Sequence, residues 1–348
     1  MITRMTLPRP DDWHVHLRDG ALLEAVLADT ARHFARAIVM PNLRPPVTDS
    51  AAARAYRARI MAALPAAVAF TPLMTAYLTD NTDAADLLAG YRDGVFTAAK
   101  LYPAGATTNS DAGVSVEARI DDVLAAMAEA GMPLLVHGEV VDAHIDVFDR
   151  EAVFIEQVLA PLRARHPRLR VVLEHITTAA AVACVQAADA ALLAATITPH
   201  HLAINRNAMF QGGLRPHMYC LPVAKRERHR AALVAAACSG DAHFFLGTDS
   251  APHTVANKET ACGCAGIYNS PTALASYLAI FEQAGALEQF EAFACRNGPR
   301  FYGLSVNRET ITLERTEATV ASGARHSPEG DICVFAPPLA LHWHAVDA

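Results

Sequence analysis

Two histidines separated by one residue, His14 and His16, are the first feature of this sequence that could do chemistry. They fall in a short apolar run, residues 13–17, that is typical of a β-strand. Side chains two residues apart share one face of a strand, so the two imidazoles can lie close enough to bind one metal ion. The pattern also occurs by chance, and it becomes informative only beside other candidate ligands.

Further candidate ligands end other apolar runs of the chain. His137 and His175 each end such a run, and Asp249 follows another, with His253 four residues later. In a parallel barrel the downstream ends of all strands meet at one rim, so these side chains would come together with the first histidine pair. Nitrogen and oxygen ligands of this kind suit zinc or a similar divalent ion. One such histidine alone would more often be a hydrogen-bonded structural residue, but the whole set predicts a metal centre.

Lys100 is an unexpected residue among candidate metal ligands, because an ammonium group has no lone pair and repels a cation. It nevertheless lies inside an apolar run, residues 97–102, that should be buried. Burial without a charged partner lowers the pKa of a lysine, and the neutral amine can then add carbon dioxide and become a carbamate. A carbamate has two oxygens and a negative charge and could bridge two metal ions. The alternative is an ordinary salt bridge or a lysine that reaches toward solvent.

The elements that must position these residues alternate along the chain. The predicted strands are residues 13–17, 37–40, 67–73, 97–102, 133–137, 170–175, 194–198 and 243–247. The predicted helices are residues 20–34, 50–64, 116–130, 151–166, 178–189 and 226–239. Eight buried strands separated by helices predict an α/β fold, a (β/α)8 TIM barrel. We expect a single domain over residues 1–348, with a short appended segment from Phe301 that holds β-like runs at 310–313 and 332–335.

A doubly wound open sheet is the alternative architecture. It would place a glycine-rich fingerprint after the first strand, where this chain instead reads HVHLRDG over residues 14–20.

Composition excludes several classes of protein. Hydrophobic residues make up 52% and charged residues 19%, which excludes a disordered chain. The net charge of −7 provides no general attraction for nucleic acid or anionic lipid. The most apolar long stretch, residues 179–199, is alanine-rich and interrupted by Gln186 and Asp189, so no membrane span is expected. No signal peptide is seen, and the seven cysteines are scattered, so we expect reduced thiols and a cytoplasmic protein.

The candidate residues stand in motifs that resemble the dihydroorotases of the monofunctional bacterial type (class II), in the amidohydrolase superfamily. The motifs are DWHVHLRD at 12–19, MPN at 40–42, AKLYP at 99–103, HGE at 137–139, EHITT at 174–178, RPH at 215–217, YCLP at 219–222, GTDSAPH at 247–253 and CGCAG at 262–266. They extend over most of the chain, and no position needed for the chemistry departs from the family pattern.

The resemblance implies two zinc ions per subunit. The ligands would be His14, His16 and Asp249 for one ion, and His137 and His175 for the other. Lys100, as N6-carboxylysine formed with CO2, would bridge them. A shared hydroxide would attack the cyclic amide of (S)-dihydroorotate, and Asp249 would act as general base and then acid, giving N-carbamoyl-L-aspartate. This reversible reaction is the third step of de novo pyrimidine (UMP) biosynthesis. The resemblance also implies a homodimer.

Arg18 is the natural partner for the substrate carboxylate, because its planar guanidinium matches a carboxylate with two parallel hydrogen bonds. A surface salt bridge with Asp19 is its alternative role. The resemblance adds substrate contacts from the side chains of His16, Asn42, His137 and His253 and from the main chain of Leu221 and Ala265.

Residues 103–113, PAGATTNSDAG, form a long loop of small residues after the Lys100 run. We predict a lid whose Thr107 and Thr108 hydroxyls reach the ligand and exclude water. A tolerated insertion is the alternative.

Two other functions remain open at this level. A hydantoinase or dihydropyrimidinase would share the metals and Lys100 but would lack the carboxylate clamp of Arg18, Asn42 and His253. A metal-free scaffold that only binds a partner would show degenerate ligand positions, which this chain does not.

Other conspicuous residues are predicted to be structural. His200 and His201 are adjacent, and adjacent side chains of an extended chain point to opposite faces, so neither is expected to bind metal. Cys262 and Cys264 lack the second cysteine pair of a zinc site.

Overall fold

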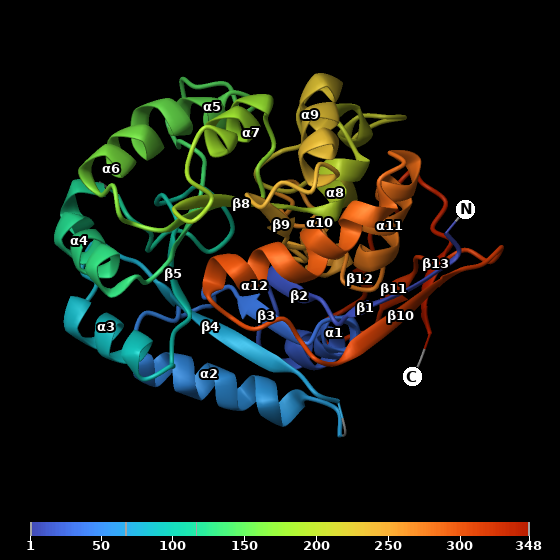
Figure 1. The fold of residues 1–348 in the computed structure, drawn as a ribbon, viewed down its shortest axis with the longest axis horizontal. Helices are drawn as coiled ribbons and strands as arrows, with labels where there is room; N and C mark the ends of the chain where they lie inside the picture. The colour runs from blue at the N-terminus through green and yellow to red at the C-terminus, as the bar shows by residue number, and fades with distance from the viewer. Residues whose placement is uncertain (1, 67, 116, 347–348) are drawn as a thin grey trace.

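The computed structural model describes residues 2–66, 68–115 and 117–346. Its centre is a sheet of eight parallel strands in which each strand pairs with the next one along the chain (Figure 1). The strands are β2 (Asp11–Val15), β3 (Arg36–Val39), β4 (Thr71–Tyr77), β5 (Ala98–Leu101), β6 (Leu134–His137), β7 (Val171–Glu174), β8 (Leu193–Ile197) and β9 (Phe244–Leu246). The predicted (β/α)8 barrel is confirmed.

The first and last barrel strands meet through the residues that follow them. The backbone N–H of Asp249 donates to the His14 carbonyl at 2.8 Å, and the N–H of His16 donates to the Ser250 carbonyl at 3.0 Å. These bonds nearly close the sheet into a barrel. They also join the two chain segments that carry candidate ligands, so closure of the barrel and assembly of the site depend on the same backbone.

Helices surround the barrel (Figure 1). They are α1 (Gly20–His33), α2 (Ser50–Ala63), α3 (Ala84–Arg92), α4 (Asp121–Ala130), α5 (Arg150–Phe154), α6 (Ala160–Arg165), α7 (Ala179–Gln186), α8 (Pro199–Ala203), α9 (Glu227–Ala237), α10 (Val255–Lys258), α11 (Ala273–Gln283) and α12 (Asn297–Tyr302). Side-chain oxygens cap several helix starts: Asp49 accepts from the N–H of Ala52, and Thr178 accepts from that of Ala181. Each cap satisfies a backbone donor that the first helical turn leaves free.

The alternation of side chains along a strand explains how polar groups reach the barrel interior. In β6, Leu135 packs with the interior cluster, whereas Leu134 and Val136 pack in the outer core against the helices. His137, two residues beyond Leu135, therefore faces inward at the end of the strand. The same spacing relates Lys100 to the interior residue Ala98 in β5. The barrel interior is therefore apolar, and the polar side chains point inward near the carboxyl ends of the strands.

Strand β2 departs from this simple alternation. Its pairing with β3 shifts in register between Asp12 and Val15. Trp13 packs in the interior cluster, and the neighbouring His14 also contacts interior groups, Glu174 and Asp249. Such an irregularity redirects a side chain at the cost of regular pairing.

Two predicted elements differ most from the structure. The sequence predicts the third strand at 67–73, but β4 covers Thr71–Tyr77 because the buried apolar run continues to Tyr77. Pro72 is tolerated in this strand because, at its position, only β3 pairs with β4. The helix expected at 116–130 is a 3-10 turn, η1 (Glu117–Ile120), followed by α4. The expected starts of both elements, residues 67 and 116, lie outside the described residues.

The appended segment forms a second sheet together with the start of the chain. Strands β1 (Arg4–Pro8), β10 (Thr310–Arg315) and β13 (Trp343–Val346) pair antiparallel in the order β1-β10-β13. Between β10 and β13 along the chain, the short strands β11 (Ala324–Arg325) and β12 (Ile332–Cys333) form a separate antiparallel pair. Leu313 and Trp343 join the main apolar core. Among the described residues, no helix has the length and apolar character to cross a membrane.

Candidate metal centre and substrate pocket

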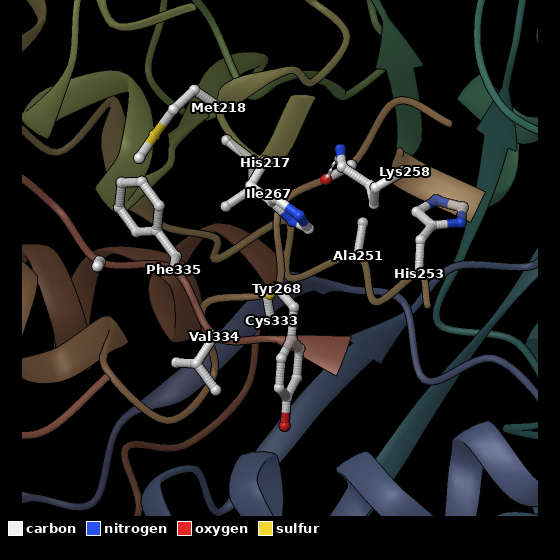
Figure 2. Close-up of a pocket in the computed structure, with 12 residues that line it drawn as sticks. His217, Met218, Ala251, His253, Lys258, Ile267, Tyr268, Cys333, Val334 and Phe335 are labelled. Carbon is white, nitrogen blue, oxygen red and sulfur yellow. Dashed lines mark hydrogen bonds between the residues drawn. The ribbon is translucent and has the colours of Figure 1, made fainter. Parts of the chain in front are cut away.

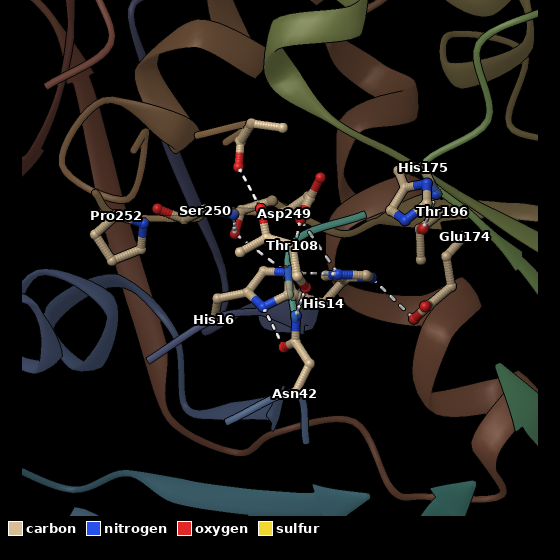
Figure 3. Close-up of polar contacts among 12 residues, drawn as sticks. His14, His16, Asn42, Thr108, Glu174, His175, Thr196, Asp249, Ser250 and Pro252 are labelled. Carbon is tan, nitrogen blue, oxygen red and sulfur yellow. Dashed lines mark hydrogen bonds and ion pairs between the residues drawn. The ribbon is translucent and has the colours of Figure 1, made fainter. Parts of the chain in front are cut away.

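The candidate ligands meet at the carboxyl ends of the barrel strands, as the sequence predicts (Figure 3). Nε2 of His14 lies 3.4 Å from Nε2 of His16, and both nitrogens lie near one carboxylate oxygen of Asp249, at 3.3 and 3.1 Å. The H-x-H pair therefore shares a face and a common partner. Ligand atoms of His14, His175 and Asp249 all lie within 4.8 Å of one another, which is the spacing of a metal cluster.

The imidazoles continue as a chain of neighbouring rings across the rim. The ring centres of His14 and His175 are 5.0 Å apart, and those of His175 and His137 are 4.9 Å apart. All of these rings are buried. Burial holds the pKa of His14, His137 and His175 below the ordinary value, although Asp249 opposes the shift. Neutral rings retain the nitrogen lone pair that a metal ion requires.

Two further observations test whether a divalent metal fits. Nδ1 of His175 is buried and has no hydrogen-bond partner, which is costly unless another ligand satisfies it. The carboxylate of Glu139 fixes the orientation of the His137 ring, because it lies 2.9 Å from Nε2 of that ring. A carboxylate behind an imidazole is the arrangement that supports metal-binding histidines. The donor set fits a metal ion.

Asp249 remains a carboxylate. Burial by itself raises its pKa, but the neighbouring imidazole of His14 outweighs burial and holds the pKa well below the ordinary value. The side chain can therefore bind a cation or accept a proton.

The backbone is strained where the site is built. Arg18, His175 and Asp249 have φ of +59°, +42° and +44°, in the left-handed region that non-glycine residues rarely adopt. Asn109, in the predicted lid, is the fourth residue of this kind among the described residues. Such conformations persist only where the surrounding structure holds them, and they concentrate at functional sites.

Lys100 is fully buried, as predicted, but it is not unpaired. Its amine contacts the carboxylate of Glu174, whose other oxygen lies 2.9 Å from Nδ1 of His14 (Figure 3). The prediction of a buried lysine without a charged partner is wrong in that respect, because a residue adjacent to His175 supplies the charge. Burial lowers the pKa of the Lys100 amine.

Glu174 and Asp12 were missed from the sequence. Both are buried and both contact the candidate ligand His14: Glu174 faces its ring, while Asp12 accepts from the backbone N–H groups of His14 and Thr248 at 3.2 and 2.8 Å. The sequence could have indicated them, because each lies close to a candidate ligand in or beside an apolar run. Acidic residues in such runs need a specific partner.

One enclosed pocket contains most of the predicted site residues. It is lined by His14, His16, Arg18, Asn42, Thr107, Thr108, His137, His175, Leu221, Asp249 and Ala265, among others. His253 lines the neighbouring pocket (Figure 2). Its Nε2 lies 3.0 Å from a guanidinium nitrogen of Arg18. Arg18 also donates to the Pro252 carbonyl at 3.2 Å. The salt bridge considered for Arg18 is absent from the described structure, because Asp19 pairs with Arg59.

The predicted lid lies over this pocket. The Thr108 hydroxyl donates to the Ala265 carbonyl at 3.2 Å, and the Asn42 side chain donates to the Thr108 carbonyl at 2.9 Å. Ser110 braces the loop, since its hydroxyl donates to the Thr107 carbonyl at 2.6 Å. Both threonines line the pocket.

The side chains of His200 and His201 lie close to each other. The prediction that they point to opposite faces of an extended segment is wrong. They occupy the short helix α8 rather than an extended segment, their ring centres are 4.5 Å apart, and Cys220 completes a buried group. Both nitrogens of His201 are already engaged, at 2.8 Å from the Thr198 hydroxyl and 2.9 Å from the Pro222 carbonyl. These hydrogen bonds support a structural role for His201.

Comparison with known proteins decides the family. Residues 12–313 match the model of the amidohydrolase family. The dihydroorotase of Synechococcus sp. (strain RCC307) is 68% identical over 99% of this chain and 98% of its own length. The chain belongs to the dihydroorotase family.

Solved structures agree with this assignment. The dihydroorotase of Campylobacter jejuni matches with a TM-score of 0.90 and 34% identity over 100% of this chain and 99% of its own. The dihydroorotase of Saccharomyces cerevisiae, solved in complex with 5-fluoroorotic acid, matches with a TM-score of 0.90 and 31% identity over 99% of both chains. All of the predicted metal ligands except Lys100 line one pocket of this chain, together with Arg18 and Asn42 of the predicted clamp and Thr107 and Thr108 of the predicted lid.

Proposed function

We propose that this chain is a dihydroorotase that interconverts dihydroorotate and N-carbamoyl-L-aspartate in pyrimidine biosynthesis. The observation that carries the proposal is the enclosed pocket, in which His14, His175 and Asp249 form a potential metal cluster beside the cationic side chain of Arg18. A cyclic amide that carries a carboxylate requires both features: one to activate the amide, the other to hold the anion.

Two Zn2+ ions are proposed for each subunit. The ligands are His14, His16 and Asp249 for one ion, His137 and His175 for the other, and Lys100 as N6-carboxylysine for both. When bound, such a pair lowers the pKa of water and polarises a carbonyl oxygen. The neutral imidazoles and the ionised Asp249 are in the protonation states that this requires.

The burial of Lys100 and its contact with Glu174 support the proposed modification. Attack of the neutral amine on CO2 forms a nitrogen–carbon bond and releases one proton from that nitrogen. Glu174 contacts the amine and can accept this proton. The product carries a negative charge in the interior and requires cations beside it, so carboxylation and metal binding should depend on each other.

Asp249 is proposed as the general base and acid. Its carboxylate faces the pocket, and its low pKa keeps it unprotonated before the reaction. It would accept a proton from the attacking water and return it to the ring nitrogen as the amide bond breaks. In the ring-closing direction the same proton moves the opposite way.

Arg18 is proposed to bind the substrate carboxylate. Its guanidinium is anchored on one side by the Pro252 carbonyl and His253, so its orientation is already set before binding. Asn42 and His253 complete the carboxylate side, His16 and His137 contact the reacting side, and the main chains of Leu221 and Ala265 hold the ring. Thr107 and Thr108 close over it and exclude water.

Three further properties belong to the proposal. Residues 1–348 form one domain, because the barrel and the appended sheet contribute to the same apolar core. The protein is cytoplasmic, in keeping with its seven free cysteines. It forms a homodimer, as the family resemblance implies.

Metal analysis paired with ring-opening assays tests the proposal. We expect about two divalent ions per chain, hydrolysis of dihydroorotate, and no comparable hydrolysis of dihydrouracil, which lacks the carboxylate. A chelator should abolish hydrolysis and added Zn2+ should restore it. Preference for dihydrouracil would indicate a dihydropyrimidinase instead, and full activity without metal would refute the proposed centre.

A further inference from the structure

Lys258, the last residue of α10, is buried and lines the pocket that adjoins the substrate pocket (Figure 2). Its ammonium group lies on three main-chain carbonyls. Nζ donates to the carbonyls of Tyr219 at 2.9 Å, Cys264 at 2.9 Å and Gly266 at 2.6 Å. An ammonium has three N–H groups, so these bonds use every donor it has. The proposed chemistry does not use this side chain.

The three carbonyls belong to two segments that approach the pocket from different parts of the chain. Residues 219–222 form one segment and residues 264–266 the other, and the N–H of Gly266 donates to the Tyr219 carbonyl at 3.1 Å. Leu221 and Ala265, one from each segment, line the substrate pocket. Neither segment belongs to a helix or a barrel strand, and the ammonium of Lys258 bonds to both.

We infer that Lys258 is a positioning residue for substrate binding, because its ammonium joins the two segments that present the main chains of Leu221 and Ala265. This inference rests on the proposed function, which assigns those main-chain groups to the substrate ring. The effect extends to the lid, since the Thr108 hydroxyl donates to the Ala265 carbonyl, which lies between two of the carbonyls that Lys258 holds.

The use of lysine in this chain supports a specific role. Of its 29 cationic side chains only three are lysines, Lys100, Lys225 and Lys258, and all three are buried. Arginine supplies the cations elsewhere. A planar guanidinium directs its donors into one plane and is larger than an ammonium, so it cannot replace a point donor enclosed by three converging carbonyls.

The test compares Lys258→Met with Lys225→Met in the metal-loaded enzyme. Lys225 is a matched control, because it is also buried and also donates to a carbonyl, that of Val223 at 2.8 Å, which does not line the substrate pocket. We expect Lys258→Met to raise KM for dihydroorotate by about tenfold or more, with a smaller change in kcat, as misplaced substrate contacts should. Lys225→Met should leave KM near the wild-type value.

Hydrogen exchange provides a second measurement that does not depend on turnover. In Lys258→Met, amides in peptides covering residues 219–222 and 263–267 should exchange faster, while those of β5 and β6 stay protected. Lys258→Arg should not restore KM, whereas Lys258→Gln, which keeps two donors, should restore part of it. If Lys258→Met does not fold, Lys258→Gln provides the same comparison.

The outcomes separate this inference from the proposed function. Wild-type protein without metal or ring-opening activity would reject the proposed function. An active wild type whose Lys258→Met variant is folded and metal-loaded, with unchanged KM and unchanged exchange, would overturn the positioning role. An equal change in KM for Lys225→Met would also overturn the positioning role. Loss of the fold in both Lys258→Met and Lys258→Gln would do the same, because Lys258 would then contribute to general stability.

Discussion

Asn42 links the candidate metal centre to the lid through its contact with Thr108. Its side-chain nitrogen donates to the Thr108 carbonyl at 2.9 Å, while its side-chain oxygen lies 2.9 Å from Nδ1 of His16. A carbonyl oxygen can only accept, so this contact fixes the proton of His16 on Nδ1 and leaves Nε2 free to face Asp249. One amide group therefore sets the tautomer of a proposed metal ligand and holds the predicted lid loop.

Replacement of Asn42 by alanine should affect both functions. We expect kcat/KM to fall by about 10- to 100-fold, the usual cost of removing a group that orients a metal ligand. Metal affinity should fall in the same variant, which titration with a competing chelator would measure. A variant with lowered kcat/KM but wild-type metal affinity would limit Asn42 to the lid.

The lid itself is tested by changing Thr107 and Thr108 to alanine together. The substitutions remove both hydroxyls over the pocket, including the one that donates to the Ala265 carbonyl, but no proposed metal ligand. Turnover should fall about tenfold or more because water is excluded less well, while zinc content stays normal. Steady-state kinetics with metal analysis would check this. Unchanged kinetics would leave residues 103–113 as a simple insertion.

Lys100→Ala should lose both metal and activity, because it removes the proposed bridging group. A small carboxylic acid supplied in solution should restore part of both by occupying the vacated space. Carboxylation can also be observed directly: with three lysines in the chain, lysine-selective isotope labelling gives a simple NMR spectrum, and labelled CO2 should produce one carbamate signal. The same signal in the Lys100→Ala protein would assign the carbamate elsewhere.

His201 should make stability depend on pH. Burial lowers the pKa of His201 to about 4 in the folded protein, against 6.5 for the exposed ring. As the pH falls below 6.5, the unfolded chain takes up a proton that the folded chain refuses, so the free energy of unfolding decreases until the pH reaches about 4. The contribution is at most about 3 kcal/mol.

Urea unfolding at pH 4.5 and pH 7 would measure this effect. The loss of stability on acidification should be smaller in His201→Gln than in the wild type, because glutamine has no proton to gain. An equal loss in both proteins would show that His201 does not contribute to the pH dependence.

Gly298 should be intolerant of a side chain, for reasons unrelated to catalysis. It lies in α12 against Trp13, and a Cβ at this position would overlap the buried indole ring. Gly298→Ala should therefore lower the free energy of unfolding by about 1–3 kcal/mol. Gly323 is a suitable control, because a Cβ there meets nothing within 4 Å. Equal unfolding midpoints in denaturant for the two alanine variants would contradict the predicted overlap.

The sequence by itself determined the barrel and most of the site. The apolar runs of the sequence predicted eight strands, with helices between them. Burial on both faces of a parallel strand leaves a continuous apolar run that can be read without a structure. Since the active site of such a barrel lies at the strand ends, the histidines and Asp249 could be placed on one rim before any contact was known.

Other features depended on the tertiary structure. The pairing of Lys100 with Glu174 joins residues 74 positions apart, and no local pattern reports such a contact. The proximity of His200 and His201 followed from a one-turn helix, which is too short to produce a periodic signal. The three carbonyls around Lys258 are main-chain groups, present at every residue, so only the path of the backbone could bring them together. Residue types and their local spacing are written in the sequence, whereas long-range contacts and backbone direction arise when the chain closes on itself.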